Sequence, residues 1–197
     1  PSEVIGYDPR LYSSGYRSAG FLAKYRRDFA FYKSTVITGL DYDYSPGRYR
    51  EQNISTVQSG SVHTAYSTGP ASYDYDVKGK GFSPYVHGEI SPSRRYKNLR
   101  FQGGLRYDMM SYNYKNNLGT LSTGDHRRPA STDLSYNHLS PKIGLIYGFS
   151  KTMNGFLSYR HAYRVPTEQN LFRQGKAEDT AGLKPIKADS FEAGFRA

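Results

Sequence analysis

The chain has 197 residues, with 27 Lys and Arg against 17 Asp and Glu, which gives a net charge of +10. It contains no cysteine, which excludes a disulfide framework, a thiolate metal site and a cysteine nucleophile. No stretch approaches the ~18–20 consecutive apolar residues of a membrane-spanning helix, so a transmembrane helical protein is excluded. The 20 Tyr and 10 Phe argue against disorder, because disordered chains are poor in aromatic residues.

Apolar and polar residues alternate along seven segments, as expected for strands with one apolar face. In chain order the predicted strands are residues 21–30, 36–44, 81–90, 99–109, 143–149, 155–163 and 190–197. The clearest is the fourth, in which Leu99, Phe101 and Leu105 occupy one face while Gln102 and Arg106 occupy the other. Its alternation is longer than the usual run of about four to eight residues and does not fit one side of a helix.

The connections between these strands alternate between short and long. Short turns are predicted at residues 31–34, 91–94 and 150–154, and long polar connections at 45–80, 111–139 and 164–185. Compact soluble domains rarely contain loops longer than ~12–15 residues, whereas outer-membrane barrels combine short periplasmic turns with long extracellular loops. We therefore predict an all-β fold, an antiparallel segment of a transmembrane β-barrel with long extracellular loops and its apolar faces toward lipid.

Two other classes of protein remain open at this point. A soluble antiparallel β-sandwich with one polar face alternates in the same way, and its function would be carbohydrate binding. An outer-membrane barrel enzyme would need a nucleophile or a catalytic dyad at the rim, and nothing in the sequence resembles one. We therefore predict no catalytic residues, no cofactor and no enzymatic activity.

Several segments resemble the barrel of TonB-dependent outer-membrane receptors. They read NLRFQGGLRYD at 98–108, LSPKIGLIY at 139–147, FLSYRHAYRVPT at 156–167 and LKPIKADSFEAGFR at 183–196. Residues 39–42 also resemble an earlier strand of the family barrel. Each motif is short, but their order and spacing together are similar to the family. The resemblance extends over most of residues 21–197.

The resemblance implies a 22-strand barrel in a Gram-negative outer membrane, filled by an N-terminal plug domain. Residues 1–197 are expected to form part of the barrel domain, with the plug domain and the C-terminal strands absent from the chain. The implied function is uptake of a scarce ligand, with a ferric siderophore as the expected ligand. The family binds its ligand on extracellular loops and the plug, and the TonB complex supplies energy by pulling on a periplasmic segment.

Charged side chains on the polar faces of the strands are candidates to face the lumen or the plug. They are Asp41, Asp43, Arg100, Arg106, Asp108, Glu192 and Arg196. Paired carboxylates such as Asp41 and Asp43 can perform acid–base chemistry, but pairing with lumenal Arg and Lys is the expected role. His87 and Glu89 fall on one side of a strand, yet no third ligand is fixed by spacing, so no metal site is assigned.

The long connections contain candidates for ligand contact, namely Tyr73, Tyr75, His126, Arg127 and Arg128. The run of alternating Tyr and Asp at 73–76 fits a ligand contact or a loop hairpin. Thr167 can cap a single short helix over the mouth of the barrel.

The pairs Arg26-Arg27, Arg94-Arg95 and Arg127-Arg128 raise the possibility of nucleic-acid binding. They are scattered among turns, a strand and a loop, and no nucleic-acid recognition module is present. We predict no nucleic-acid partner. The excess of basic residues is expected to bind lipopolysaccharide phosphates and anionic ligands. The lipid bilayer is a further expected partner of the chain.

Overall fold

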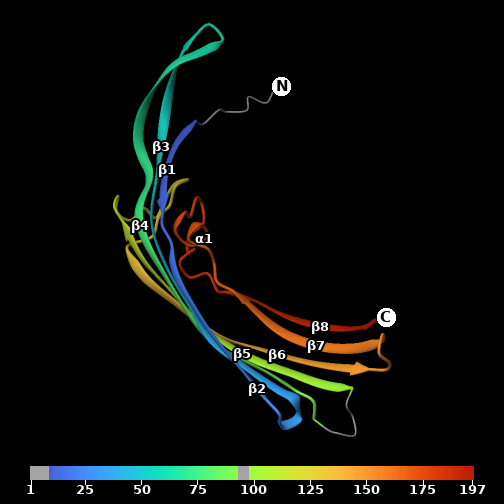
Figure 1. Ribbon diagram of the computed structural model, residues 1–197. Coiled ribbons are helices and arrows are strands. Elements are labelled where there is room, and N and C mark those ends of the chain that lie inside the picture. Colours follow the sequence, from blue (N-terminus) through green and yellow to red (C-terminus); the bar gives the residue numbers. More distant parts are fainter. Residues whose placement is uncertain (1–8, 93–97) are drawn as a thin grey trace.

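The chain forms one curved antiparallel sheet, whose strands alternate apolar and polar side chains and which Figure 1 shows as a half-barrel. The computed structural model describes residues 9–92 and 98–197. Its strands are β1 Arg10–Tyr16, β2 Ala19–Phe29, β3 Ser34–Ser59, β4 Val62–Ile90, β5 Leu99–Asn116, β6 Thr132–Gly148, β7 Asn154–Arg164 and β8 Ile186–Arg196. A 3₁₀ turn, η1 (Phe31–Lys33), and one α-helix, α1 (Glu168–Phe172), complete the described elements. Neither helix is long or apolar enough to cross a membrane.

Each strand from β3 to β8 pairs with the next one along the chain. Strands β1 and β2 both pair with β3, and the pairs Tyr16–Gly47 and Ala19–Tyr44 share one register. The two are therefore successive parts of one strand, interrupted opposite Pro46, which has no N–H to donate. All seven predicted strands are confirmed, while β1 was not predicted. The described strands form one sheet, which contradicts the two-sheet sandwich.

The predicted connection over 45–80 is wrong. Strands β3 and β4 continue through it as a hairpin, paired from Ser45–Gly79 to Ser59–Val62 and turning at Gly60, whose φ is +65°. Figure 1 shows this hairpin projecting beyond the rest of the sheet. The sequence predicts a loop here because the outward face of the hairpin is charged and lacks the apolar residues that mark the other strands.

The other two long connections are shorter than predicted. The connection after β5 covers residues 117–131, and the one after β7 covers 165–185 and contains α1. At the opposite end, η1 joins β2 to β3, and residues 149–153 join β6 to β7. Half of the predicted turn at 91–94, including Arg94, lies outside the described residues, and so does Arg95. The predicted asymmetry between the two ends of the sheet is otherwise confirmed.

The two faces of the sheet differ in polarity. Large apolar side chains on the convex face are exposed, among them Leu105 (46%), Ile143 (60%) and Leu157 (56%). The concave face carries charged and amide side chains such as Asp41 and Arg106, which bond to each other. An apolar outside and a polar inside are the reverse of a soluble barrel and match a sheet surrounded by lipid.

Replacing Leu105 with Arg puts a charge on the lipid-facing side of β5. We expect the free energy of unfolding to fall by about 2–4 kcal/mol, the cost of an Arg at the bilayer midplane. The matched control is Gln102→Arg, three residues away on the concave face, which we expect to be tolerated. Denaturant unfolding of the full-length protein in liposomes measures both. Equal destabilisation by the two variants would contradict the assignment of the faces.

Candidate functional site

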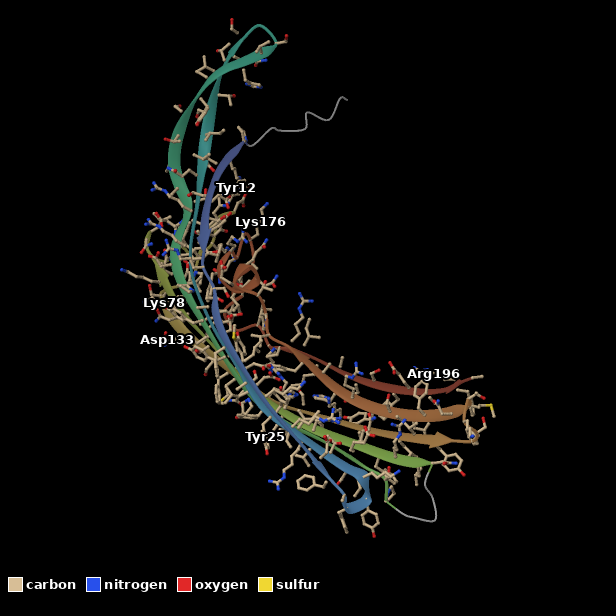
Figure 2. All side chains as sticks on the ribbon, viewed as in Figure 1. Tyr12, Tyr25, Lys78, Asp133, Lys176 and Arg196 are labelled. Atoms are coloured by element: carbon tan, nitrogen blue, oxygen red, sulfur yellow. The ribbon has the colours of Figure 1, made fainter. Side chains whose placement is uncertain are left out.

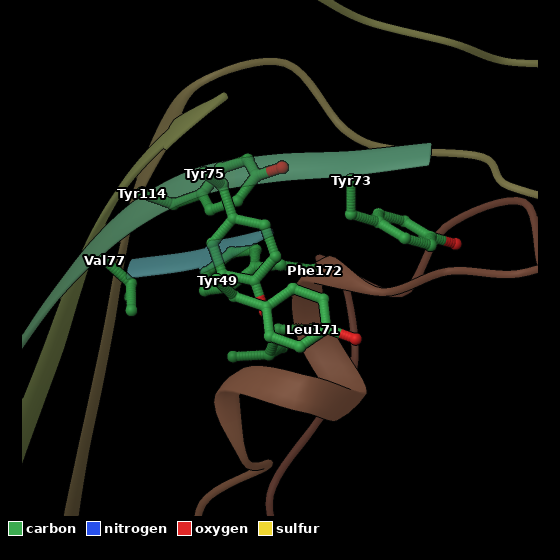
Figure 3. Close-up of a cluster of buried hydrophobic side chains, with 7 residues drawn as sticks. All are labelled: Tyr49, Tyr73, Tyr75, Val77, Tyr114, Leu171 and Phe172. Atoms are coloured by element: carbon green, nitrogen blue, oxygen red, sulfur yellow. The ribbon is translucent and has the colours of Figure 1, made fainter. Parts of the chain in front are cut away.

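A cluster of buried side chains lies on the concave face where the sheet extends past the apolar belt (Figure 3). We call it the mouth cluster, and it consists of Tyr49, Tyr73, Tyr75, Val77, Tyr114, Leu171 and Phe172. The first five come from β3, β4 and β5, and the last two from α1. The long connection after β7 therefore folds inward and packs its helix against the barrel wall.

Aromatic stacking holds α1 in place. The ring of Phe172 stacks on Tyr114 with centroids 4.0 Å apart and planes 9° from parallel. Tyr75 lies between Tyr49 and Tyr114, at centroid distances of 5.4 and 5.3 Å. Leu171 and Phe172 are 0% exposed, and burying side chains of this size stabilises the packed loop by roughly 1.5–3 kcal/mol each.

The start of α1 is fixed by a capping box. The Thr167 side chain accepts a hydrogen bond from the Asn170 backbone N–H, and the Asn170 side chain accepts one from the backbone N–H of Thr167. Such a cap satisfies N–H groups that a helix leaves unpaired at its first turn. The predicted short helix capped by Thr167 is thereby confirmed, and the cap orients Leu171 and Phe172 toward the wall.

Two tyrosine hydroxyls lie beside the Glu168 carboxylate at the start of α1. Tyr75 donates a hydrogen bond from its hydroxyl to the Glu168 carboxylate, across 93 residues of sequence. The ring of Tyr16 covers Gly47, where a Cβ atom would lie 2.2 Å from that ring. Burial, followed by hydrogen bonding to Glu168, raises the pKa of both Tyr16 and Tyr75 above its ordinary value. Both hydroxyls therefore remain protonated donors for the Glu168 carboxylate.

Tyr49 connects the wall to the end of α1. Its hydroxyl donates to Glu51 at 2.9 Å, and Arg173 lies 4.3 Å above its ring. A guanidinium over an aromatic face is attracted by the ring quadrupole. Burial and the Glu51 carboxylate raise the pKa of Tyr49 to about 12. Glu51 also accepts a bond from Arg10 of β1 at 2.5 Å, which extends the network to the neighbouring strand.

Arg127 and Arg128, predicted as ligand contacts, tie the connections together. The backbone N–H of Arg127 donates to the carbonyl of Gly175 at 2.9 Å. Arg128 donates to the carbonyls of Ser72 at 2.9 Å and Gly119 at 2.8 Å. Residues 117–131 are thereby bonded both to β4 and to the connection that carries α1.

The other three loop candidates also lie at this junction. His126 packs edge-on against the ring of Tyr73 at 5.8 Å, and the Tyr73 hydroxyl accepts from the N–H of Gly175 at 3.0 Å. Tyr73 and Tyr75 are only 3% and 1% exposed. The structure therefore brings the five loop candidates to one region but uses them to fix the loops.

At the level of the apolar belt, the concave face carries a charged network. Arg106 bonds to Asp41 at 2.5 Å and to Asp108 at 2.7 Å. A hollow of about 430 Å³ lies beside it, lined in part by His87 and Lys142. Three of the predicted lumenal residues therefore meet in one group, which leaves the Arg106 cation fully paired.

The remaining lumenal candidates lie apart from this group. Asp43 accepts from Ser45 at 2.6 Å and Ser18 at 3.1 Å, so Asp41 and Asp43 have separate partners. Arg100 pairs with Glu89 at 3.4 Å. Glu192 and Arg196 lie on β8, and within residues 9–92 and 98–197 neither has a hydrogen bond or an ion pair with another side chain.

Sequence reasoning missed two groups. Glu168, Arg173 and Tyr16 meet only because α1 folds inward, and no local pattern marks them. The second group is His138 on β6 and His161 on β7, whose Nε2 atoms lie 2.8 Å apart. His161 Nδ1 also lies 2.7 Å from the Asp189 carboxylate, so Asp189, His161 and His138 form a chain of three titratable groups.

Comparison with known proteins identifies the family. Residues 4–197 match the family model described as TonB dependent receptor-like, beta-barrel. A search of curated proteins found no match. Solved structures with the same fold include the unliganded ferric citrate transporter FecA, with a TM-score of 0.66 and 18% identity over 96% of this chain. The copper transporter OprC gives 0.64 and 16% over 93%, and the ferric-catecholate import receptor Fiu from K12 E. coli gives 0.61 and 16% over 92%.

The chain spans about a quarter of the length of these transporters, from 26% of FecA to 29% of Fiu. At these identities the structures show a shared fold, whereas the family model covers every described strand. The shared fold and the family match both agree with a convex surface that faces lipid. This chain belongs to the TonB-dependent receptor-like β-barrel family, whose members lie in the Gram-negative outer membrane.

Proposed function

We propose that this chain forms part of the barrel of a receptor that takes up a ferric siderophore through the outer membrane with energy from TonB. The observation that carries the proposal is the inward-folded connection 165–185, anchored by α1 at the mouth above a charged lumenal wall. Such a loop narrows the entrance and presents polar groups to an entering ligand. Two of the similar structures are a ferric citrate transporter and a ferric-catecholate import receptor, which supports iron as the cargo.

The unpaired edges support a larger barrel. Within the described part of the chain, β1 and β2 have a sheet neighbour on one side only, and so does β8. Bare strand edges are not stable in hydrocarbon, because their N–H and C=O groups have no water to bond. We propose that further strands close this sheet into the 22-strand barrel of the family. A plug domain then faces the network of Asp41, Arg106 and Asp108, together with Asp43, Arg100, Glu192 and Arg196.

The loop candidates have a positioning role in this proposal. Tyr73, Tyr75, His126, Arg127 and Arg128 hold the two long connections against the wall, and the outer surfaces of those connections meet the ligand. Contacts of this kind fix a loop without binding the ligand. The similar structures are transporters and an import receptor, so we propose transport and no catalytic step.

The packing of α1 gives a direct test of the anchored loop. Leu171→Ala removes a fully buried side chain, and we expect a loss of about 2–5 kcal/mol of local packing energy. Trypsin cleavage of the folded receptor at Arg173 and Lys176, followed by mass spectrometry, should become faster. The matched control is Leu183→Ala in the same connection, where the side chain is 41% exposed. Equal cleavage in both variants would show that α1 is not anchored.

Uptake is tested in the source bacterium. Deletion of the gene should abolish uptake of at least one radiolabelled ferric siderophore from a chemically diverse panel, and the intact gene should restore it. A protonophore, or loss of TonB, should stop that uptake. Normal uptake of every ferric siderophore after deletion would refute the assigned cargo. Uptake that persists without TonB would refute the assigned energy source.

A further inference from the structure

Strands β6 and β7 separate toward the extracellular end of the sheet. Their backbone ladder ends at the pair Lys142–Arg160, although both strands continue beyond it. Strand β7 stays paired with β8 to its last residue, Arg164, so β7 and β8 leave β6 together. Figure 2 shows the consequence: Asp133, near the start of β6, lies on the wall, whereas Lys176, beyond the end of β7, lies on the concave side.

Two histidines connect the strands just beyond the last backbone pair. The Nε2 atoms of His138 on β6 and His161 on β7 lie 2.8 Å apart, and their ring centroids are 4.8 Å apart. The ring of Tyr163 stacks on His138 with centroids 4.4 Å apart and planes 12° from parallel, which holds that imidazole in place. Side chains therefore replace backbone hydrogen bonds as the link between β6 and β7 at this level.

The Asp189 carboxylate fixes the protonation of the His161 ring. It lies 2.7 Å from Nδ1 of His161 and also accepts a hydrogen bond from the Tyr159 hydroxyl at 2.8 Å. An ionised carboxylate can only accept, so Nδ1 carries the proton of the neutral imidazole and Nε2 presents a lone pair to His138. A carboxylate on the far nitrogen is the arrangement that orients histidine ligands at metal sites. The proton between the two Nε2 atoms thus occupies a position that a metal ion can take.

The pair borders the lumenal hollow beside the charged network of Arg106. His161 is one of the residues that line this hollow of about 430 Å³, which gives water access to the pair. The Tyr163 hydroxyl is buried and has no hydrogen-bond partner among the described residues, and a metal-bound water would supply one. In the same part of the chain, no three histidine or acidic side chains surround a metal position. The protein therefore offers two ligands and leaves the other coordination positions to water.

The charges around the pair decide which kind of ion fits. Asp189 contacts one ring, and Asp108 lies opposite His138 in the ladder of β5 and β6. Lys187 lies in the β7–β8 ladder two residues from Asp189 and opposes a cation there. Imidazole nitrogens bind zinc, copper and nickel well, whereas magnesium and calcium require oxygen ligands. The site therefore favours a late transition-metal ion over an ion held by charge alone.

We propose that His138 and His161 bind one divalent zinc or copper ion through their Nε2 atoms. The ion displaces the proton that lies between the two rings, and that proton is released to solvent. Metal–nitrogen bonds of about 2.0–2.1 Å around a tetrahedral ion place the two nitrogens ~3.4 Å apart, so the pair opens by roughly 0.6 Å. The bound ion cross-links β6 to β7 at the base of the connection that carries α1. The proposal does not depend on which cargo the receptor takes up.

Zinc titration of the full-length receptor in detergent, after removal of metals with a chelator, tests the proposal. The test variant combines His138→Gln and His161→Gln, and the matched control is His63→Gln in the projecting hairpin. Isothermal titration calorimetry should show that the test variant loses one bound zinc relative to the unsubstituted receptor, whereas the control retains it. Asp189→Asn keeps both ligands and should weaken that binding by about 10–100-fold, the usual cost of losing a partner that orients a ligand. Unchanged zinc stoichiometry in the folded double variant would overturn the proposal.

A crystal structure of the unsubstituted receptor grown with zinc keeps the test decisive if the double variant fails to fold. Diffraction data collected at the zinc absorption edge should show an anomalous peak between the Nε2 atoms of His138 and His161, with both nitrogens at bonding distance. The two rings still in direct contact, with no anomalous peak between them, would show a hydrogen bond only. That result would overturn the proposal whatever zinc binds elsewhere on the receptor.

Discussion

Backbone hydrogen bonding in hydrocarbon is the constraint on which this structure depends. A strand that crosses lipid must bond every N–H and C=O to a neighbouring strand, because no water is available inside the bilayer. The ladders from β3 to β8 meet this demand through continuous antiparallel pairing. Once the strands are fixed, a period of two sends alternate side chains to lipid and to the lumen, so the inverted polarity of the two faces follows.

Above the membrane the same strands have water on both sides, and their side chains change accordingly. The convex face loses its apolar residues and becomes cationic, while the concave face gains the aromatic mouth cluster. That cluster exists because the connection after β7 folds back and buries Leu171 and Phe172 against it. The entrance is therefore shaped by hydrophobic packing, and the wall below it by the ion pairs around Arg106.

The sequence was sufficient to predict the membrane-crossing strands, because alternation is strongest where one face meets lipid. Leu99, Phe101 and Leu105 mark β5 without any structural information. The hairpin of β3 and β4 was missed, although Tyr73 and Tyr75 alternate with Asp74 and Asp76, because its outward face is charged and carries no apolar residues to mark a strand. The bond between Tyr75 and Glu168 joins residues 93 apart, and no local pattern predicts a contact of that range.

The central claim, that this sheet crosses lipid with alternate residues facing out, is tested most directly by a cysteine scan of residues 100–109 in β5. The 197 residues contain no cysteine, so each introduced thiol is the one new reporter in this segment. Intact cells carrying the full-length receptor are treated with a membrane-impermeant thiol reagent or with a lipid-soluble one. We expect the lipid-soluble reagent to label odd positions such as 101 and 105, with even positions protected from it. Labelling without a period of two would contradict the account.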